Sequence, residues 1–287
     1  MGVSIPTATV QTSGRRAVVA VWYGVICHTG FVLALASMMV AMYFGMSRSL
    51  GRVPQPWGWV ANAALLLAFP VLHSILLSTR GRAVLARLAP AGTGATLSTT
   101  TYVIIASAQV FALFALWTPS GTIWWHARSA GLAAVDLLYA ASWLLLGKAI
   151  LDAGLNLHTG SIGWTALLRG SKPMYPQMPS TGLFRFTRQP IYVAFALTVW
   201  TVPTWTPDQL AVALTLTAYC LIGPLFKEAR FRRVHGSTFD RYAGAVAGVA
   251  ISTMTRMPRT KALASLEITA VASCRWSEPM RCRPLVP

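Results

Sequence analysis

The stretch that decides the fold is Gly182-Leu-Phe-Arg-Phe-Thr-Arg-Gln-Pro-Ile-Tyr192, a basic and amide-bearing run directly before a long apolar segment. The apolar segment covers residues 191–226, and Pro-Thr-Trp-Thr-Pro-Asp at 203–208 interrupts it near the middle. Because proline breaks helices, we expect two short helices folded back on each other. A polar helix over residues 227–242 follows, and the hairpin would return it to the side where Gly182 lies.

This arrangement predicts a polar cup at the mouth of an apolar hairpin. Such a cup suits a charged cofactor that meets a membrane-soluble substrate. The side chains expected in the cup are Arg185, Arg188, Gln189, Glu228, His235 and Tyr242.

Composition places the rest of the chain in a membrane. Of 287 residues, 55% are hydrophobic and only 11% are charged, and the mean hydropathy is +0.55. The net charge of +17 gathers between apolar runs, which is typical of membrane topology and argues against a nucleic-acid partner. The four cysteines, at 27, 220, 274 and 282, lack metal-ligand spacing, so we expect no metal site and no disulfide framework.

Apolar runs predict an all-α, polytopic integral membrane protein with about six spans. Four precede Gly182, at residues 17–46, 57–77, 97–117 and 130–151, and each is near the roughly 20 residues that a crossing needs. The hairpin arms, of about 15 and 18 residues, would be the fifth and sixth spans, either tilted or dipping into the bilayer. Residues 1–16 are expected to be an N-terminal segment, 17–251 the membrane domain, and 252–287 a basic, disordered tail.

The basic residues between spans predict the orientation. With the N-terminus inside, the inner segments collect most of the arginines and lysines, so the positive-inside rule favours a cytoplasmic N-terminus and cytoplasmic motifs, as in a bacterial-type inner membrane. An odd number of spans before Gly182 would break this pattern.

The two motifs resemble those of the membrane methyltransferase superfamily that contains isoprenylcysteine carboxyl, phospholipid N- and methanethiol S-methyltransferases. That family has a G-x-Y-R-x-x-R-H-P-x-Y-x-G run, a helical hairpin, and then E-E-x-x-x-x-x-x-x-G-x-x-Y-x-x-Y. The chain departs from this pattern at Phe184, Gln189, Ala194, Lys227 and Phe239. It matches at Gly182, Arg185, Arg188, Pro190, Tyr192, Glu228, Gly236 and Tyr242.

This resemblance implies S-adenosyl-L-methionine as the cofactor. Glu228 would hold the ammonium group of the cofactor, and Arg185 and Arg188 its carboxylate through a guanidinium fork. Glutamine cannot titrate, so Gln189 can help to hold a carboxylate but cannot act as a general base. No catalytic residue is assigned. The remaining expected cofactor-binding residues are Pro190, Tyr192, His235 and Tyr242.

Each of these residues also has a simpler interpretation. Glu228 beside Lys227 fits half of a surface ion pair, and arginines at the inner membrane edge are the ordinary positive-inside signal. Tyr192 fits an interfacial aromatic anchor. His235 and Tyr242, two turns apart on one predicted helix, fit a solvated amphipathic face as well as they fit residues flanking adenosine.

Ionisable residues inside the spans indicate where an acceptor binds. Such residues are costly in a bilayer and usually face a cavity, so His73 and Asp136 are expected to line the acceptor pocket, while Lys148 and Asp152 fit a pair on one helix face. Residues 73–82 and 98–103 also resemble the methanethiol S-methyltransferase branch, which favours a small thiol.

The sequence therefore predicts transfer of a methyl group to a small or membrane-partitioning acceptor, with membrane lipids as further partners. Three alternatives stay open. They are an inactive binding or regulatory protein of the same fold, a small transporter, and an enzyme acting on a lipid amine or a prenylated cysteine carboxylate. The sequence does not indicate an oligomeric state.

Overall fold

The fold is almost entirely helical, as the sequence predicts. The computed structural model describes residues 7–248, so the predicted tail at 252–287 lies outside the described residues. Two short strands, β1 (Trp125–His126) and β2 (Thr204–Trp205), pair antiparallel with Trp125 opposite Trp205. The helical elements are α1 (Thr7–Tyr43), α2 (Trp57–Leu76), α3 (Thr79–Leu88), α4 (Gly94–Ala115), α5 (Ser129–His158), α6 (Ser161–Arg169), the 3-10 turn η1 (Gly182–Arg185), α7 (Pro190–Trp200), α8 (Pro207–His235) and α9 (Ser237–Ala245).

Five helices in the described part of the chain are long and apolar enough to cross a membrane. They are Gly14–Tyr43 of α1, and α2, α4, α5 and α8 in full. Four of these precede Gly182, in agreement with the expected even number. The polytopic all-α membrane fold is thereby confirmed.

The hairpin differs in detail from the sequence expectation. Its first arm, α7, has only 11 residues, or about 16 Å of helix, which is about half the apolar thickness of a bilayer. Its second arm, α8, has 29 residues and continues past Lys227 to His235, so the polar segment begins as part of the span. The separate amphipathic helix starts only at Ser237.

The hairpin turn is held by hydrogen bonds rather than by apolar contact alone. Thr206 caps α8 by accepting a hydrogen bond from the backbone N–H of Gln209 at 2.9 Å, and Pro207 occupies the first helical turn. The buried carboxylate of Asp208 accepts two hydrogen bonds from Ser120, from the backbone N–H at 2.9 Å and from the hydroxyl at 2.6 Å. These contacts fasten the turn to the loop that follows α4.

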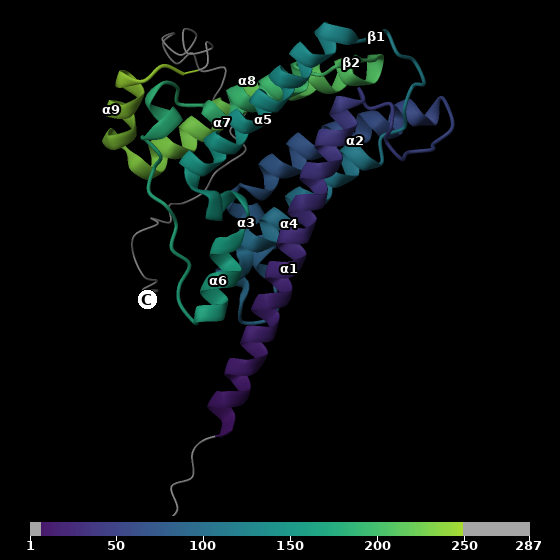
Figure 1. Ribbon diagram of the computed structural model, residues 1–287. Coiled ribbons are helices and arrows are strands. Elements are labelled where there is room, and N and C mark those ends of the chain that lie inside the picture. The colour runs from purple at the N-terminus through teal and green to yellow at the C-terminus, as the bar shows by residue number, and fades with distance from the viewer. Residues whose placement is uncertain (1–6, 249–287) are drawn as a thin grey trace, which may run out of the picture.

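The helices form two groups (Figure 1). In one, α1 packs along α4, with α2, α3 and α6 around them; in the other, α5, α7 and α8 run alongside one another. The groups meet over a shared core near the hairpin turn and diverge towards the end where α8 gives way to α9. The core residues come from both groups and include Met42, Phe114, Trp117, Tyr139, Val199 and Leu216.

Candidate functional site

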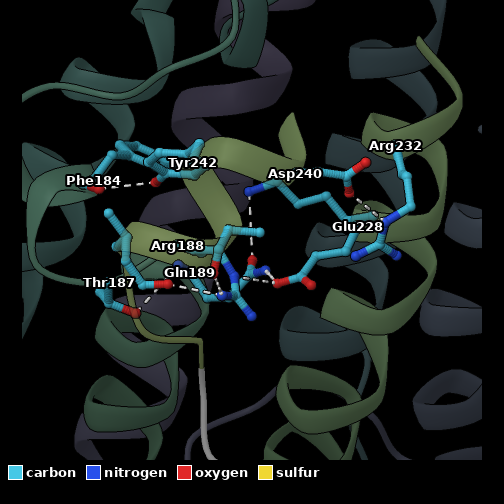
Figure 2. A network of polar contacts seen from close by, with 11 residues as sticks. Phe184, Thr187, Arg188, Gln189, Glu228, Arg232, Asp240 and Tyr242 are labelled. Carbon is cyan, nitrogen blue, oxygen red and sulfur yellow. Dashed lines mark hydrogen bonds and ion pairs between the residues drawn. The ribbon is translucent and has the colours of Figure 1, made fainter. Parts of the chain in front are cut away.

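The two sequence motifs meet at the diverging end of the helices (Figure 2). Arg188 lies just before α7 and Glu228 lies near the end of α8, and Arg188 Nε donates to Glu228 Oε1 at 2.9 Å. The side chains of this ion pair are 10% and 19% exposed. The expected approach of the two motifs across the hairpin is therefore observed.

Arg188 also fastens the end of α9. Its Nη1 donates to the carbonyl oxygens of Ala243 and Val246, both at 2.7 Å, and its backbone N–H donates to the carbonyl of Ala247 at 3.0 Å. Two nitrogens of the guanidinium thus already have acceptors within the protein. The Arg188 guanidinium therefore closes a turn of the chain, and its contact with a cofactor carboxylate stays a prediction.

Gln189 connects the pair to Lys227. Its side-chain amide is almost fully buried, at 1% exposure, and its Nε2 donates to Glu228 Oε1 at 2.8 Å. Its Oε1 lies 3.5 Å from Lys227 Nζ. Pro190 follows as the first residue of α7 and fixes where that helix begins. A glutamine suits this position because it donates and accepts at the same time.

One oxygen of Glu228 remains open. Oε1 accepts both hydrogen bonds, from Arg188 and from Gln189, and none reaches Oε2 within the described residues. Because the side chain is 19% exposed, water and small cations reach it. The carboxylate is therefore oriented by its neighbours with one oxygen free to accept a further donor.

Lys227 lies among aromatic rings. Its Nζ is 5.4 Å from the ring centre of Phe184, 5.9 Å from that of Tyr192 and 5.3 Å from that of Phe231. Contacts of this kind stabilise an ammonium group when it is desolvated. The Tyr192 ring also packs on Gly223, where an added Cβ would lie 3.0 Å from it, so Tyr192 fills the interface between α7 and α8 rather than standing free as a membrane anchor.

The end of the second motif is divided between two helices. His235 is the last residue of α8 and Tyr242 lies on α9, so the prediction that they share one helix is wrong. Gly236 separates them with φ 52°, a conformation that favours glycine. The two side chains instead flank one aromatic cluster, in which Phe231 contacts both His235 and Phe239, and Phe239 contacts Tyr242.

Tyr242 holds the first motif in place. Its hydroxyl donates to the carbonyl of Phe184, a residue of η1, at 2.8 Å. Partial burial raises the pKa of Tyr242 above its ordinary value, while the charge of Arg188 opposes the rise. The hydroxyl is therefore neutral at physiological pH and available as a donor.

Arg185, the remaining basic residue of the first motif, is exposed. Among the residues that the structure describes it makes no hydrogen bond or ion pair. Arg230, two residues after Glu228, likewise takes part in none of the ion pairs within the described chain. These two arginines are available to a ligand.

Asp152 is a residue of this site that sequence reasoning did not assign to it. It pairs with Lys148 as expected, and its Oδ2 also accepts from the backbone N–H of Leu183 at 2.8 Å. An added Cβ on Gly182 would lie 2.3 Å from the same carboxylate. Glycine is therefore required at this position of the motif, because the Asp152 carboxylate approaches its backbone closely. No sequence pattern indicates this contact.

A cavity of about 320 Å³ opens beside this contact, between the end of α5 and the segment before η1. The α5 helix bends here at Gly154, whose φ is 102°. His158, which sequence reasoning also missed, donates from Nδ1 to the Gly154 carbonyl at 3.0 Å and lies within electrostatic range of Lys227. The residues that line the cavity are 151–154 and 176–181.

His73 and Asp136 do not share a pocket. Near the end of α2, the Nε2 of His73 lies 2.7 Å from the Tyr102 hydroxyl, and its ring contacts Tyr219 of α8. Asp136 lies near the start of α5, where it interacts with Tyr43 at the end of α1. His73 is thus at the motif end of the molecule and Asp136 at the opposite end, because α2 and α5 begin on the same side.

Within the part of the chain that the structure describes, no group of three or more histidine, cysteine or acidic residues is arranged to hold a metal ion. The polar groups that converge on this site are the arginine, glutamine and carboxylate pairings described above. Their arrangement suits recognition of a small molecule that carries both charges.

Comparison with known proteins gives relatives of modest identity. A methanethiol S-methyltransferase of Pseudomonas sp. (strain GM41(2012)) is 28% identical over 227 residues, which cover 77% of this chain and 85% of the relative. One of Mycobacterium tuberculosis is 26% identical over 187 residues, covering 64% and 74%. Nurim of Rattus norvegicus is 26% identical over 218 residues, covering 66% and 81%. No family model and no solved structure matches the chain. These relatives confirm the resemblance to a membrane methyltransferase-type family that the two motifs predict.

Proposed function

We propose that the chain is a membrane methyltransferase that uses S-adenosyl-L-methionine and methylates a small thiol such as methanethiol. The observation that carries this proposal is the ion pair of Arg188 and Glu228, which joins motifs 40 residues apart at one end of the hairpin. Several relatives are named methanethiol S-methyltransferase, and that substrate is the best first candidate here.

The charged groups of the site fit such a cofactor in part. Glu228 Oε2 is open and oriented, as an acceptor for the cofactor ammonium would need to be. Arg188 is engaged by Glu228 and by backbone carbonyls, so the cofactor carboxylate falls to Arg185 or Arg230. Tyr192, His235 and Tyr242 remain proposed neighbours of the cofactor through the aromatic rings around Lys227 and Phe231. When bound, the cofactor supplies an electrophilic methyl group on a sulfonium.

The residues of the site act by binding and positioning rather than by acid–base catalysis. A bound cofactor would supply a methyl carbon that a thiolate could displace from the sulfonium, with the electron pair of the broken C–S bond remaining on the departing sulfur. Such a displacement would move no proton, so a site whose residues bind and orient without a general base would be sufficient. Apolar and aromatic surroundings favour a transition state in which opposite charges cancel.

The acceptor side of the site is proposed to lie towards His73. The rings of His73, Tyr102 and Tyr219 join α2 and α4 to α8, and Tyr219 in turn contacts Tyr192, which lies beside Lys227. This chain of rings leads from between the helices to the charged cluster. A small apolar thiol that enters from the lipid would follow it. Entry of the cofactor from the cytoplasm stays a prediction of the positive-inside pattern.

A second candidate, a binding protein without transferase activity, is favoured by Lys227. A cation stands where the resembling motif has its first glutamate, and some relatives are named nurim, which states no activity. The two candidates differ in a single measurable property, since only the enzyme forms methylated product.

The test uses purified full-length protein in lipid nanodiscs with methyl-labelled S-adenosylmethionine and methanethiol. The proposal expects labelled dimethyl sulfide in the headspace, and loss of at least nine-tenths of it in Glu228→Gln. Asp240→Asn is the matched control, because it removes a carboxylate from an arginine pair that is more than half exposed. Cofactor binding without product would favour the binding protein, and neither binding nor product would refute both.

A further inference from the structure

The charges around Glu228 do not balance. Its own charge is matched by Arg188, with which it pairs. Lys227 and Arg230 lie on the same face of the site, yet within the described chain neither forms an ion pair, and the one hydrogen bond of Lys227 goes to the neutral amide of Gln189. The site therefore carries an excess of positive charge.

Aromatic rings surround Lys227. Three of them lie within 6 Å of its ammonium group, and the faces of such rings attract a cation. Electrostatic interactions are also stronger at a partly buried position than in bulk water, because the effective dielectric constant is lower. The other titratable groups that face it are Glu228 and Arg230 on α8, Tyr192 on α7 and His158 on α5.

From this imbalance we infer that Lys227 selects the chemical class of the acceptor, favouring an anionic nucleophile over a neutral amine. The inference rests on the proposed function. Because Lys227 adjoins Glu228 in the chain, an acceptor that reaches a cofactor held by Glu228 enters the field of both Lys227 and Arg230.

The charge balance of the two reactions differs. A thiolate or carboxylate loses its negative charge on methylation and gives a neutral product. Before the transfer, the positive charge of the site stabilises the anionic form of the acceptor. The thiol releases its proton beforehand to water, which reaches the partly exposed Glu228 side chain. An amine becomes a cationic ammonium as its N–C bond forms, beside the uncompensated cation of Lys227, and loses its proton only afterwards. The same field thus assists one class of acceptor and opposes the other.

The test compares three acceptors of similar shape, ethanethiol, propionate and ethylamine, with the full-length enzyme in nanodiscs of neutral lipid. The variants are Lys227→Met, which keeps the length of the side chain without its charge, and Lys227→Arg, which keeps the charge. Arg233→Met is the matched control, since it removes a charge from an exposed position of the same helix. Affinity for S-adenosylmethionine is measured in parallel.

The wild type and Lys227→Arg should methylate ethanethiol best and ethylamine least. At pH 7, Lys227→Met should lower kcat/KM for ethanethiol about tenfold, as expected when a nearby cation no longer stabilises the thiolate by about 1.4 kcal/mol. Its cofactor affinity should be equal or higher, because a like charge near the sulfonium is gone. Arg233→Met should match the wild type.

Unchanged thiol kinetics in folded Lys227→Met, or a wild type that prefers ethylamine, would overturn the inference and leave the proposed function standing. If Lys227→Met does not fold, the inference is tested by the order in which the wild type and Lys227→Arg methylate the three acceptors. Both should methylate ethanethiol best and ethylamine least, and any preference for ethylamine would overturn the inference. Absence of product from every acceptor would overturn the proposed function itself and this inference with it.

Discussion

Replacing Arg188 by alanine should release α9 from the end of the hairpin at which the two motifs meet. The substitution removes one ion pair, to Glu228 at 2.9 Å, and two hydrogen bonds to carbonyls of the α9 end at 2.7 Å. Each charged hydrogen bond contributes about 1.5–3 kcal/mol, and breaking a largely buried pair costs about 3–5 kcal/mol. Because these contacts share one side chain and are not additive, we expect a loss of about 3–5 kcal/mol in the docking of α9.

Hydrogen–deuterium exchange in nanodiscs measures this loss directly. The backbone N–H of Val246, which donates to Tyr242 at 3.0 Å, reports on the end of α9. Its protection should fall by about 10²–10⁴-fold in Arg188→Ala, since each 1.4 kcal/mol corresponds to a factor of ten. Arg185→Ala is the control, because Arg185 is exposed and makes no contact in the described residues, and it should change protection by less than about threefold. Equal protection in the two variants would refute the view that Arg188 holds α9.

Two further substitutions test the neighbouring contacts. Gly182→Ala should destabilise the protein by about 2 kcal/mol or more, because the added Cβ would meet Asp152 at 2.3 Å and because φ is +60°. Gly131→Ala is the control, since no atom lies within 4 Å of its added Cβ, and it should leave stability unchanged. Similar thermal melting of the two variants would contradict the required glycine at 182. Tyr242→Phe should cost about 1 kcal/mol by removing the hydrogen bond to Phe184. Because the pKa of Tyr242 is raised in the folded state, its contribution is present below about pH 10 and is lost above it, so melting of wild type and variant should differ at pH 7 and converge at higher pH.

The long elements could be predicted from the sequence because hydrophobic length is a local property. The four spans before Gly182 and the break at 203–208 follow from apolar runs and prolines, and the structure has them. The sequence predicts a short first arm of about 15 residues, and α7 is shorter still, with 11 residues. Hydropathy does not reveal the exact end of this helix, where the Val199 carbonyl accepts a hydrogen bond from Gln209 Nε2 at 2.8 Å. A proline inside α8, Pro224, likewise fails to end that helix.

The site was predictable in its residues and less so in their roles. Motif spacing brought Arg188, Gln189 and Glu228 together, but it gave no sign that the guanidinium would be engaged by backbone carbonyls of α9. Asp152 was missed because its contact with Leu183 joins segments 31 residues apart, and no pattern marks such a contact. The separation of Asp136 from His73 follows from the predicted orientation, in which the second and fourth spans run in the same direction. His73 lies near the end of one span and Asp136 near the start of the other, so the shared pocket was inconsistent with that orientation.

The most direct test of the central claim is calorimetric titration of S-adenosylmethionine onto the purified protein in nanodiscs. The claim is that Glu228, held by Arg188 and Gln189, offers an open carboxylate oxygen to the cofactor. We expect saturable binding to the wild type, binding at least tenfold weaker in Glu228→Gln, and unchanged affinity in Asp240→Asn. A wild type that does not bind, or a Glu228→Gln variant that binds as well as the wild type, would contradict the claim.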